Sequence, residues 1–447
     1  MKIIIIGAGE VGVHLARHLS KEHHDITLIE EKSKRAQSIQ DEMDIMVIEG
    51  NGASPEVLRK AGLAQCDLFL AVTNMDEVNM VASLSASRYN VPFKIARVSN
   101  MHFYDLDNYL GGKNLGTDLL INPEFECALQ VANLLKIPGA SEYAEFAGGD
   151  VFLFGLSIAE GAPCLQSSLQ ELRQDIEDIH FLVGSISRGA ETFIPKGHTV
   201  LKAGDQAYFI AQRNHLDQVY DFCGIEKKPV KRVMILGGSK VSRYLCQILE
   251  KQNIKATLVV PDEFEAERMA EDLTNTLIIN GDVKDFDLLL QEGLSDIDCF
   301  LALTPRDEDN MLTGIFAREK KVPYVIALLG KLEYLPVFNK MGVNTSVSPR
   351  VAVTNSILKY ARTGNITSVA TIQNSQTEIM EFEVAAGSFV EGKPLKDLKL
   401  PRDVMLAMVH RDYNDFIPSG DSVLRPKDHV VAITISKDHH KLEKLFT

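Results

Sequence analysis

The chain contains two copies of one long pattern, with starting points about 230 residues apart. The first copy opens with the apolar run Ile3–Ile6, followed by Gly7-Ala8-Gly9-Glu10-Val11-Gly12. The second opens with Val233–Leu236, followed by Gly237-Gly238-Ser239. Five further short matches share one offset of 231 residues: Glu49-Gly50-Asn51 with Asn280-Gly281-Asp282, Ala61-Gly62-Leu63 with Glu292-Gly293-Leu294, Ala71-Val72-Thr73 with Ala302-Leu303-Thr304, Asp76-Glu77-Val78-Asn79-Met80 with Asp307-Glu308-Asp309-Asn310-Met311, and Val91-Pro92 with Val322-Pro323. Chance does not keep one register over so many matches, so the chain is duplicated.

Each copy alternates apolar runs with helical stretches. In the first copy the expected strands cover residues 2–6, 26–29, 46–49, 68–72 and 94–98, and helices are expected at 11–20 and 54–61. The runs are almost continuously apolar, which is typical of strands covered on both faces. The alternation predicts an α/β fold with a Rossmann-like, doubly wound parallel sheet in each copy.

A different rhythm follows each large lobe. Short strands separated by turns are expected at 151–158, 181–186 and 207–210, and again at 380–384, 404–410 and 430–435. These segments also repeat: Gly161-Ala162-Pro163 matches Gly392-Lys393-Pro394, and Ile194-Pro195 with Asp205 matches Ile417-Pro418 with Asp428. We therefore expect two tandem Rossmann-like domains, each followed by a small α+β domain, at 1–124, 142–226, 230–350 and 366–447.

An amphipathic helix is predicted after each large lobe. Phe125, Ala128, Leu129, Ala132 and Leu135 follow helical spacing after Pro123, and residues 351–360 occupy the equivalent place. Such a helix either connects domains while packing on its own lobe, or crosses over to pack against the other copy of the lobe.

Bulk properties exclude several classes of protein. A length of 447 residues favours about three domains, and 45% hydrophobic with 24% charged residues is ordinary for a globular chain. No apolar stretch approaches a membrane span, and the start predicts no signal peptide. The six cysteines are scattered singly, which argues against zinc motifs and disulfides and for a reducing cytoplasm. A net charge of −14 disfavours nucleic acid.

The first glycine turn has the pattern of a dinucleotide site. Gly7, Gly9 and Gly12 lie between a strand and a helix, where they permit the tight turn, close approach of a pyrophosphate, and close helix–strand packing. The N–H groups of Ala8, Glu10 and Val11 would face an anion at the helix N-terminus.

Further candidates lie where the other strands end. Glu30, rather than its neighbour Glu31, is expected to accept hydrogen bonds from a ribose diol, which favours NAD(H) or an adenine nucleotide over NADP(H). Asn51 either bonds the base or ribose or serves a plain turn. Arg97 either binds a terminal phosphate or forms an interface salt bridge. Thr73 and Asn74 share this edge, whereas Asp76, Glu77 and Asn79 are interpreted as capping a helix.

The second copy departs from this pattern. Ser239 and Ser242 replace Gly9 and Gly12, Val260 or Pro261 replaces Glu30, and Leu328 replaces Arg97, whereas Gly237, Gly281 and Thr304 are retained. We expect this lobe to bind no nucleotide, or to bind one weakly.

Together these motifs resemble RCK domains (regulators of potassium conductance). The resemblance rests on the glycine turn, the acidic strand end, Gly50-Asn51-Gly52, the run from Ala71 to Met80, and Ile95-Ala96-Arg97-Val98. The four-part layout is similar to the cytosolic RCK subunits of Trk-type potassium uptake systems.

The resemblance implies a regulatory protein without enzymatic activity. It implies NAD(H) or ADP/ATP as regulatory ligands, and a homo-oligomeric ring, expected to be a tetramer. The ring would lie at the cytoplasmic face of the membrane, beneath a Trk-type potassium-translocating subunit that its geometry gates. Glu30 departs mildly from the Asp that is common in relatives.

Other functions stay open. An NAD-dependent dehydrogenase would need an acid/base group near the nicotinamide, and His180 and His198 form no such constellation. A regulatory subunit of another transporter is a further alternative. His14 and His18 are spaced for a metal, with His23 and His24 just beyond, but a solvated helix face is the preferred interpretation.

Overall fold

The computed structural model describes residues 1–104, 114–175, 179–189, 191–341, 343, 345–361, 366–372, 377–401, 404–412, 414–435 and 439–446. The chain divides into two compact units. The first comprises residues 1–129 and 348–361, and the second comprises residues 130–347 and 362–447. No helix among the described residues is both long and apolar enough to span a bilayer.

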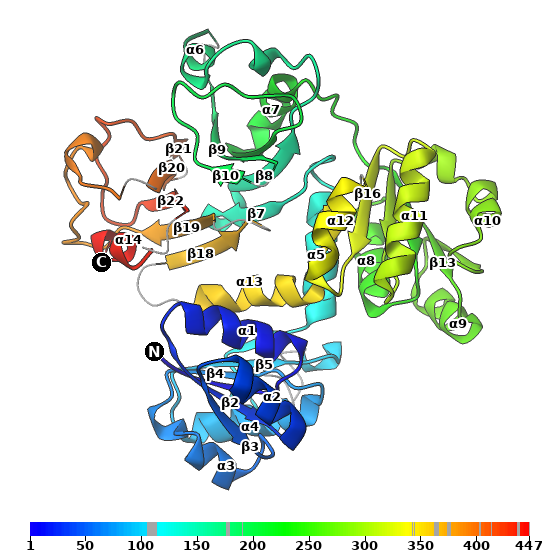
Figure 1. Cartoon of the computed structure of the whole chain (residues 1–447), viewed down its shortest axis with the longest axis vertical. Coiled ribbons are helices and arrows are strands. Elements are labelled where there is room, and N and C mark those ends of the chain that lie inside the picture. The colour runs from blue at the N-terminus through cyan, green and yellow to red at the C-terminus, as the bar shows by residue number, and fades with distance from the viewer. Residues whose placement is uncertain are drawn as a thin grey trace. The chain divides into compact units, whose positions relative to one another are not determined.

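The first lobe is a parallel sheet with helices on both faces (Figure 1). Its strand order is β3-β2-β1-β4-β5-β6. The strands are β1 (Lys2–Ile6), β2 (Asp25–Glu30), β3 (Met46–Glu49), β4 (Leu68–Ala71), β5 (Phe93–Arg97) and β6 (Leu119–Ile121). The helices are α1 (Glu10–Lys21), α2 (Ser33–Glu42), α3 (Pro55–Lys60) and α4 (Asp76–Arg88). The order reverses between β1 and β4, which is where open α/β sheets bind ligands.

The second lobe repeats this sheet in the order β14-β13-β12-β15-β16-β17. The strands are β12 (Arg232–Leu236), β13 (Lys255–Val260), β14 (Thr276–Asn280), β15 (Cys299–Ala302), β16 (Tyr324–Leu328) and β17 (Thr345–Val347). The helices are α8 (Lys240–Lys251), α9 (Glu263–Asp272), α10 (Phe286–Gln291), α11 (Asp307–Glu319) and α12 (Leu335–Lys340). The expected doubly wound fold is confirmed in both lobes, and β2 and β13 end at Glu30 and Val260, so Val260 rather than Pro261 replaces Glu30.

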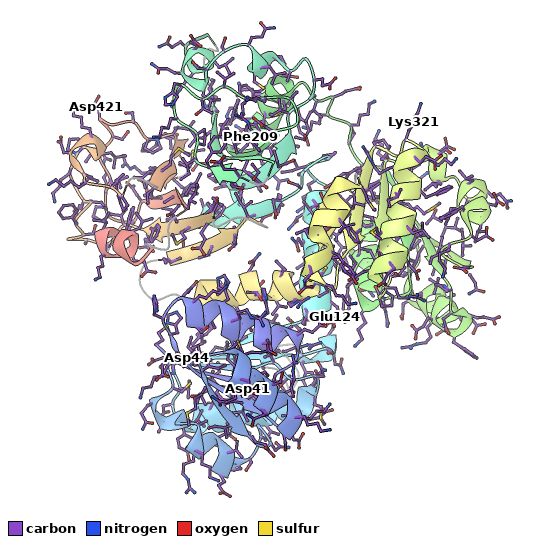
Figure 2. All side chains as sticks on the ribbon, viewed as in Figure 1. Asp41, Asp44, Glu124, Phe209, Lys321 and Asp421 are labelled. Carbon is purple, nitrogen blue, oxygen red and sulfur yellow. The ribbon has the colours of Figure 1, made fainter. Side chains whose placement is uncertain are left out.

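Each small domain is built on an antiparallel sheet. The first has the order β10-β9-β11-β8-β7 and the second β18-β19-β22-β20-β21. Their elements are β7 (Tyr143–Phe146), β8 (Val151–Ser157), α6 (Leu169–Asp175), β9 (Phe181–Arg188), β10 (Glu191–Phe193), β11 (Gln206–Gln212) and α7 (Leu216–Cys223), then β18 (Ile366–Thr371), β19 (Glu378–Glu383), β20 (Val404–Arg411), β21 (Asn414–Phe416), β22 (His429–Thr434) and α14 (His439–Phe446). Phe209, labelled in Figure 2, is fully buried and packs edge-on against Phe181 and Phe222.

A repeated ion pair explains the aspartates that the sequence singled out. In the first small domain, Arg188 Nε and Nη2 donate to the two carboxylate oxygens of Asp205 at 2.8 and 2.6 Å. In the second, Arg411 bonds Asp428 in the same way at 2.8 and 2.7 Å. Both aspartates are buried, so the paired geometry compensates for their loss of hydration.

The helix after the second lobe packs on the first lobe. This helix, α13 (Pro349–Ala361), lies along α1 (Figure 1), and Val353, Ile357 and Leu358 are buried in the core of the first lobe. Tyr360 stacks on Phe93 with ring centroids 4.8 Å apart. The crossover interpretation is therefore confirmed for α13.

The segment after the first of these helices, α5 (Pro123–Leu134), is tied to the second lobe. The carbonyl oxygen of Ala140 accepts hydrogen bonds from the hydroxyl groups of Tyr324 and Thr345. Residues 130–134 of α5 accordingly belong to the second unit, while its start belongs to the first. The four sheets lie inside the four predicted domain ranges, whose boundaries stay a prediction.

One histidine in the second small domain makes stability depend on pH. His429 Nδ1 lies 2.6 Å from the buried Glu381 carboxylate, and this hydrogen bond raises the pKa of His429 above its ordinary 6.5 although burial opposes the shift. A histidine whose pKa is higher in the folded than in the unfolded protein stabilises the fold at a pH below its unfolded pKa. This contribution to the free energy of unfolding is lost as the pH rises through the folded pKa. We expect the melting temperature to fall between pH 6 and pH 9, and His429→Gln to remove part of this fall. Equal pH dependence in both proteins, measured by calorimetry, would refute this assignment.

Candidate functional site

A pocket of about 430 Å³ lies in the first lobe at the carboxyl edge of its sheet. The predicted residues that line it are Gly7, Ala8, Gly9, Glu30, Asn51, Thr73 and Asn74. The predicted residues Glu10, Val11, Gly12 and Arg97 are not among those that line it. The strand ends therefore gather most of the predicted site residues at the point where the strand order reverses.

The three glycines of the turn have different steric surroundings. Gly7 has a φ of +97°, and its N–H donates to the Ile29 carbonyl at 2.9 Å. A Cβ on Gly12 would lie 1.9 Å from the Gly7 carbonyl oxygen, so this residue is needed for helix packing. A Cβ on Gly9 would meet nothing within 4 Å, although Gly9 is the N-cap of α1. The open space at Gly9 is thus next to a helix N-terminus, which favours a bound anion.

Glu30 is held against the glycine turn. One carboxylate oxygen accepts from the Ala8 N–H at 2.8 Å, and the other accepts from the Lys32 N–H at 2.9 Å. Glu31 also lines the pocket but is exposed, and its carboxylate accepts a long hydrogen bond from Asn51 Nδ2 at 3.4 Å. Both Glu30 oxygens retain a lone pair for a further hydrogen bond, and the role of Glu30 toward a ribose stays a prediction.

Two cations line the pocket that the sequence analysis did not identify. Lys32 is the N-cap of α2, and Arg35 lies in its first turn with Nε donating to the Ala8 carbonyl at 3.2 Å. Both residues follow the acidic strand end, but neither belongs to the glycine pattern. A positive charge beside an anion-binding helix N-terminus complements a pyrophosphate.

The remaining predicted residues are engaged with the protein. Asn51 Oδ1 accepts from the Ala53 N–H at 2.8 Å, so Asn51 stabilises a turn while it lines the pocket. Arg97 donates to Asn74 Oδ1 at 2.7 Å and forms an ion pair with Glu124 at 3.4 Å. The ion-pair interpretation of Arg97 is therefore observed, although within the first unit, and a role in phosphate binding stays a prediction.

The helix-capping interpretation is wrong for Asp76 and Asn79. The carboxylate of Asp76 accepts from the N–H groups of Ser99 and Asn100, and the N-cap Met75 has no side-chain cap. The fully buried Asn79 accepts from the N–H and hydroxyl of Thr73 and donates to the carbonyls of Thr73 and Arg97. Asn79 therefore joins the ends of β4 and β5. Glu77 lies in the first turn of α4, where an acid suits the helix dipole.

The second lobe keeps this structural network. Asn310 makes the same four bonds, to Thr304 and to the Leu328 carbonyl. Asp307 accepts from the N–H groups of Gly330 and Lys331 in the same manner as Asp76. The shared Asp-Glu-x-Asn-Met motif is thus explained by strand-end packing in both copies.

The second lobe lacks the anion-binding features. Ser239, the N-cap of α8, accepts from the Ser242 N–H at 3.2 Å, so a hydroxyl caps the helix where the first lobe has open space. Helices α2 and α9 have equal lengths and places in the repeat, so Lys32 and Arg35 correspond to Asp262 and Glu265. Two positive charges are therefore replaced by two negative charges, which would repel a phosphate.

Comparison with known families identifies the tandem arrangement. The TrkA-N domain model matches residues 3–123 and 233–349, and the TrkA-C domain model matches residues 153–224 and 379–447. Full-length relatives include "Trk system potassium uptake protein TrkA" of Azorhizobium caulinodans, which is 31% identical over 100% of this chain and 98% of its own length. The "Trk system potassium uptake protein TrkA homolog 2" of Methanosarcina mazei is 34% identical over the full length of both chains.

Solved structures share the fold. The RCK domain of GsuK aligns with a TM-score of 0.61 at 15% identity, covering 100% of this chain and 94% of its own. The GsuK channel bound to NAD aligns with a TM-score of 0.62, covering 100% of this chain and 78% of its own.

Proposed function

The chain belongs to the TrkA family, and from this premise we propose that it is a regulatory, nucleotide-sensing subunit of a potassium uptake system. The ligand would be NAD(H), ADP or ATP, held in the pocket of the first lobe. The observation that carries the proposal is the open space at Gly9, which lies between a helix N-terminus and the side chains of Glu30 and Arg35. One relative in fold, the GsuK channel, is described as bound to NAD and another GsuK structure as bound to ADP.

The residues present fit such a nucleotide. The N–H groups at the start of α1, together with Arg35 and Lys32, would hold the phosphates. Glu30 would accept from the ribose hydroxyls and would repel a 2′-phosphate. Asn51, Thr73 and Asn74 complete the wall of the pocket.

A chain of polar contacts leads from this wall to the helices between domains. Asn74 accepts from Arg97, which pairs with Glu124 in the first turn of α5. Glu126, two residues later in the same first turn, accepts from the Ser356 hydroxyl of α13 at 3.0 Å. If a nucleotide contacts Asn74 more favourably in one conformation of the protein than in another, its binding would therefore favour the arrangement of α5 and α13 that belongs to that conformation. A ligand moves such an equilibrium only by its differential affinity for the two states.

The partner in this proposal is a membrane-embedded, Trk-type potassium-translocating subunit. The chain would assemble as a homotetrameric ring on its cytoplasmic face, and ring geometry would set the open probability of the pore. Relatives are named for potassium uptake, and the GsuK structures, which are described as an RCK domain and as a channel, share the fold. The proposal includes no catalytic step.

Potassium uptake by cells that lack this chain tests the function without assuming a ligand. We expect slow growth and slow uptake at limiting potassium, restored by the wild-type chain but not by a nucleotide-binding variant. Purified protein mixed with NADH and a panel of metabolites gives the opposing test, since substrate-dependent NADH oxidation would favour a dehydrogenase and count against the proposal.

Glu30 should set both affinity and cofactor choice. We expect Glu30→Gln to weaken NADH binding by about tenfold, because one charge-assisted hydrogen bond to a ribose hydroxyl is worth roughly 1.5 kcal/mol or more. The same change should narrow the preference for NADH over NADPH. Calorimetric titration measures both, and Glu31→Gln is the matched control with near-normal affinity. Unchanged NADH affinity in Glu30→Gln would show that another residue receives the ribose.

A further inference from the structure

One face of the second small domain packs on the first small domain, and both domains belong to the second compact unit. An apolar cluster joins them, to which the first domain contributes Leu153 and the second contributes Ile379. The contact is close, because a Cβ on Gly184 would lie 2.3 Å from the side chain of Ile433. Polar groups that bond across this contact therefore depend on the docking of the two domains.

A buried aspartate of the second domain holds a side chain of the first. The side chain of Asp415 is 4% exposed. One of its oxygens accepts from His410 Nδ1 at 2.6 Å, and the other accepts from the side-chain amide of Gln212, in the first domain, at 2.5 Å. Burial deprives a carboxylate of its hydration, so the aspartate relies on one partner from each domain.

A buried glutamate repeats this arrangement. The side chain of Glu381 is also 4% exposed, and it accepts from His429 Nδ1 at 2.6 Å and from the N–H of Ala147 in the first domain. Burial has the largest influence on the pKa of Glu381 and raises it, but the hydrogen bonds from His429 and Ala147 hold this pKa below its ordinary 4.5. The rings of His410 and His429 lie 6.2 Å apart, so the two histidine–carboxylate pairs are neighbours.

The first small domain shows that the sheet does not require these ionisable groups. The repeated ion pairs fix the alignment of the two domains, since Arg188–Asp205 matches Arg411–Asp428. With this alignment and the strand pairing, His410, Asp415, His429 and Glu381 stand in place of Ser187, Thr192, Gln206 and Gly155. The second domain thus carries four groups whose charge depends on pH where the first carries none.

The surroundings of the two imidazoles favour their protonated forms. Among the described residues, the charged groups that face them from β19, β20, β21 and β22 are Glu381, Glu383, Asp415, Asp428 and Arg411. The hydrogen bond to Glu381 raises the pKa of His429, so its contribution is present at low pH and is lost as the pH rises through the folded pKa. Deprotonation leaves a net negative charge buried at the domain contact, which disfavours docking.

We propose that the two histidine–carboxylate pairs form a proton-dependent clasp between the small domains, closed while the imidazoles carry a proton and weakened when they lose it. The clasp goes beyond the stability of one domain, because Gln212 and Ala147 belong to the other domain. A rise in pH would then release one small domain from the other. Its use as a second regulatory input rests on the proposed function, whereas the clasp itself does not.

Hydrogen-exchange mass spectrometry of the full-length protein at pH 6 and pH 9, corrected for the intrinsic pH dependence of exchange, tests the clasp. The N–H of Ala147 is a direct reporter, because it donates to Glu381. We expect protection of peptides that cover Ala147 to fall at pH 9 by about threefold or more, the effect of losing one ion pair at a partly exposed site. Strands β12 and β15 should keep their protection, which shows that the chain remains folded.

Variants that copy the first domain identify the groups responsible. His429→Gln copies Gln206, which the same strand position accommodates, and should make the protection of Ala147 independent of pH. Glu381→Gln is nearly isosteric and gives the same test from the other partner if His429→Gln does not fold. His198→Gln, at an exposed histidine of the first domain, is the matched control that keeps the change. The proposal is overturned if the wild type shows no change between the two pH values, or if the folded variant keeps the full change.

Discussion

Replacing Gly9 by aspartate is expected to lower NADH affinity at least about a hundredfold while the protein stays folded. The new side chain would enter open space, because a Cβ at Gly9 meets nothing within 4 Å. Its carboxylate would then lie at the N-terminus of α1, where it competes with the nucleotide phosphates for the same N–H groups. A loss of about 2.7 kcal/mol in binding corresponds to this factor. Calorimetric titration with NADH measures the loss, and circular dichroism confirms the fold.

Gly9→Ser is the matched control that the chain itself supplies. Ser239 occupies this place in the second lobe, where its hydroxyl caps α8 through the Ser242 N–H. We expect Gly9→Ser to keep or raise thermal stability through the added cap and to lose less affinity than Gly9→Asp. If Gly9→Asp bound NADH as tightly as the wild type, the phosphates would have to lie elsewhere.

Replacing Asn79 by alanine is expected to destabilise the pocket edge by roughly 2–4 kcal/mol. The change removes four hydrogen bonds and leaves the N–H of Thr73 and the carbonyl of Arg97 without their partner inside the lobe. Hydrogen-exchange mass spectrometry should show faster exchange in peptides that cover β4 and β5. NADH affinity should fall at least about tenfold, because Thr73 and Asn74 line the pocket.

Asn310→Ala separates structural from ligand effects. Asn310 makes the equivalent four bonds in the second lobe. The variant should speed exchange in β15 and β16 by a similar factor and leave NADH affinity unchanged. Equal losses of NADH affinity in both variants would mean that the two lobes share the nucleotide, contrary to the proposal.

Most of the fold could be predicted because its signals are local. The apolar runs of β1 and β4 and the intervening helices follow periodicities that short windows reveal. Strands β6 (Leu119–Ile121), β7, β10 and β21 were missed, since strands of three or four residues carry too little pattern to stand out from loops. The six-residue β18 was also missed. The path of α13 onto the first lobe was one of two alternatives, because amphipathic spacing shows that a face is buried but not what covers it.

Only part of the candidate site could be predicted, because some of its residues belong to a sequence motif and others are brought there by packing. Gly7, Gly9 and Glu30 belong to a motif with a known geometry, and the structure places all three at the pocket. Arg35 was missed because it reaches the glycine turn from a neighbouring helix, a contact that only the packing of α2 creates. The role of Asn79 was misassigned because a side chain that joins two strand ends has the same sequence position as a helix cap.

The two copies of the lobe differ most in the charge of the residues beside the glycine turn. Serines replace glycines in the second turn, but Asp262 and Glu265 in place of Lys32 and Arg35 carry the larger electrostatic consequence. The second copy keeps the Asn310 network that holds its strands together. It has therefore retained the residues that maintain the fold and lost those that would hold a phosphate.

The number of nucleotides bound per chain distinguishes one working nucleotide site from two. Calorimetric titration of the full-length protein with NADH, at known active concentration, gives this number without assumptions about the membrane partner. We expect one high-affinity NADH per chain, with binding abolished by Gly9→Asp. Two equivalent sites per chain, or one site that survives Gly9→Asp, would contradict it.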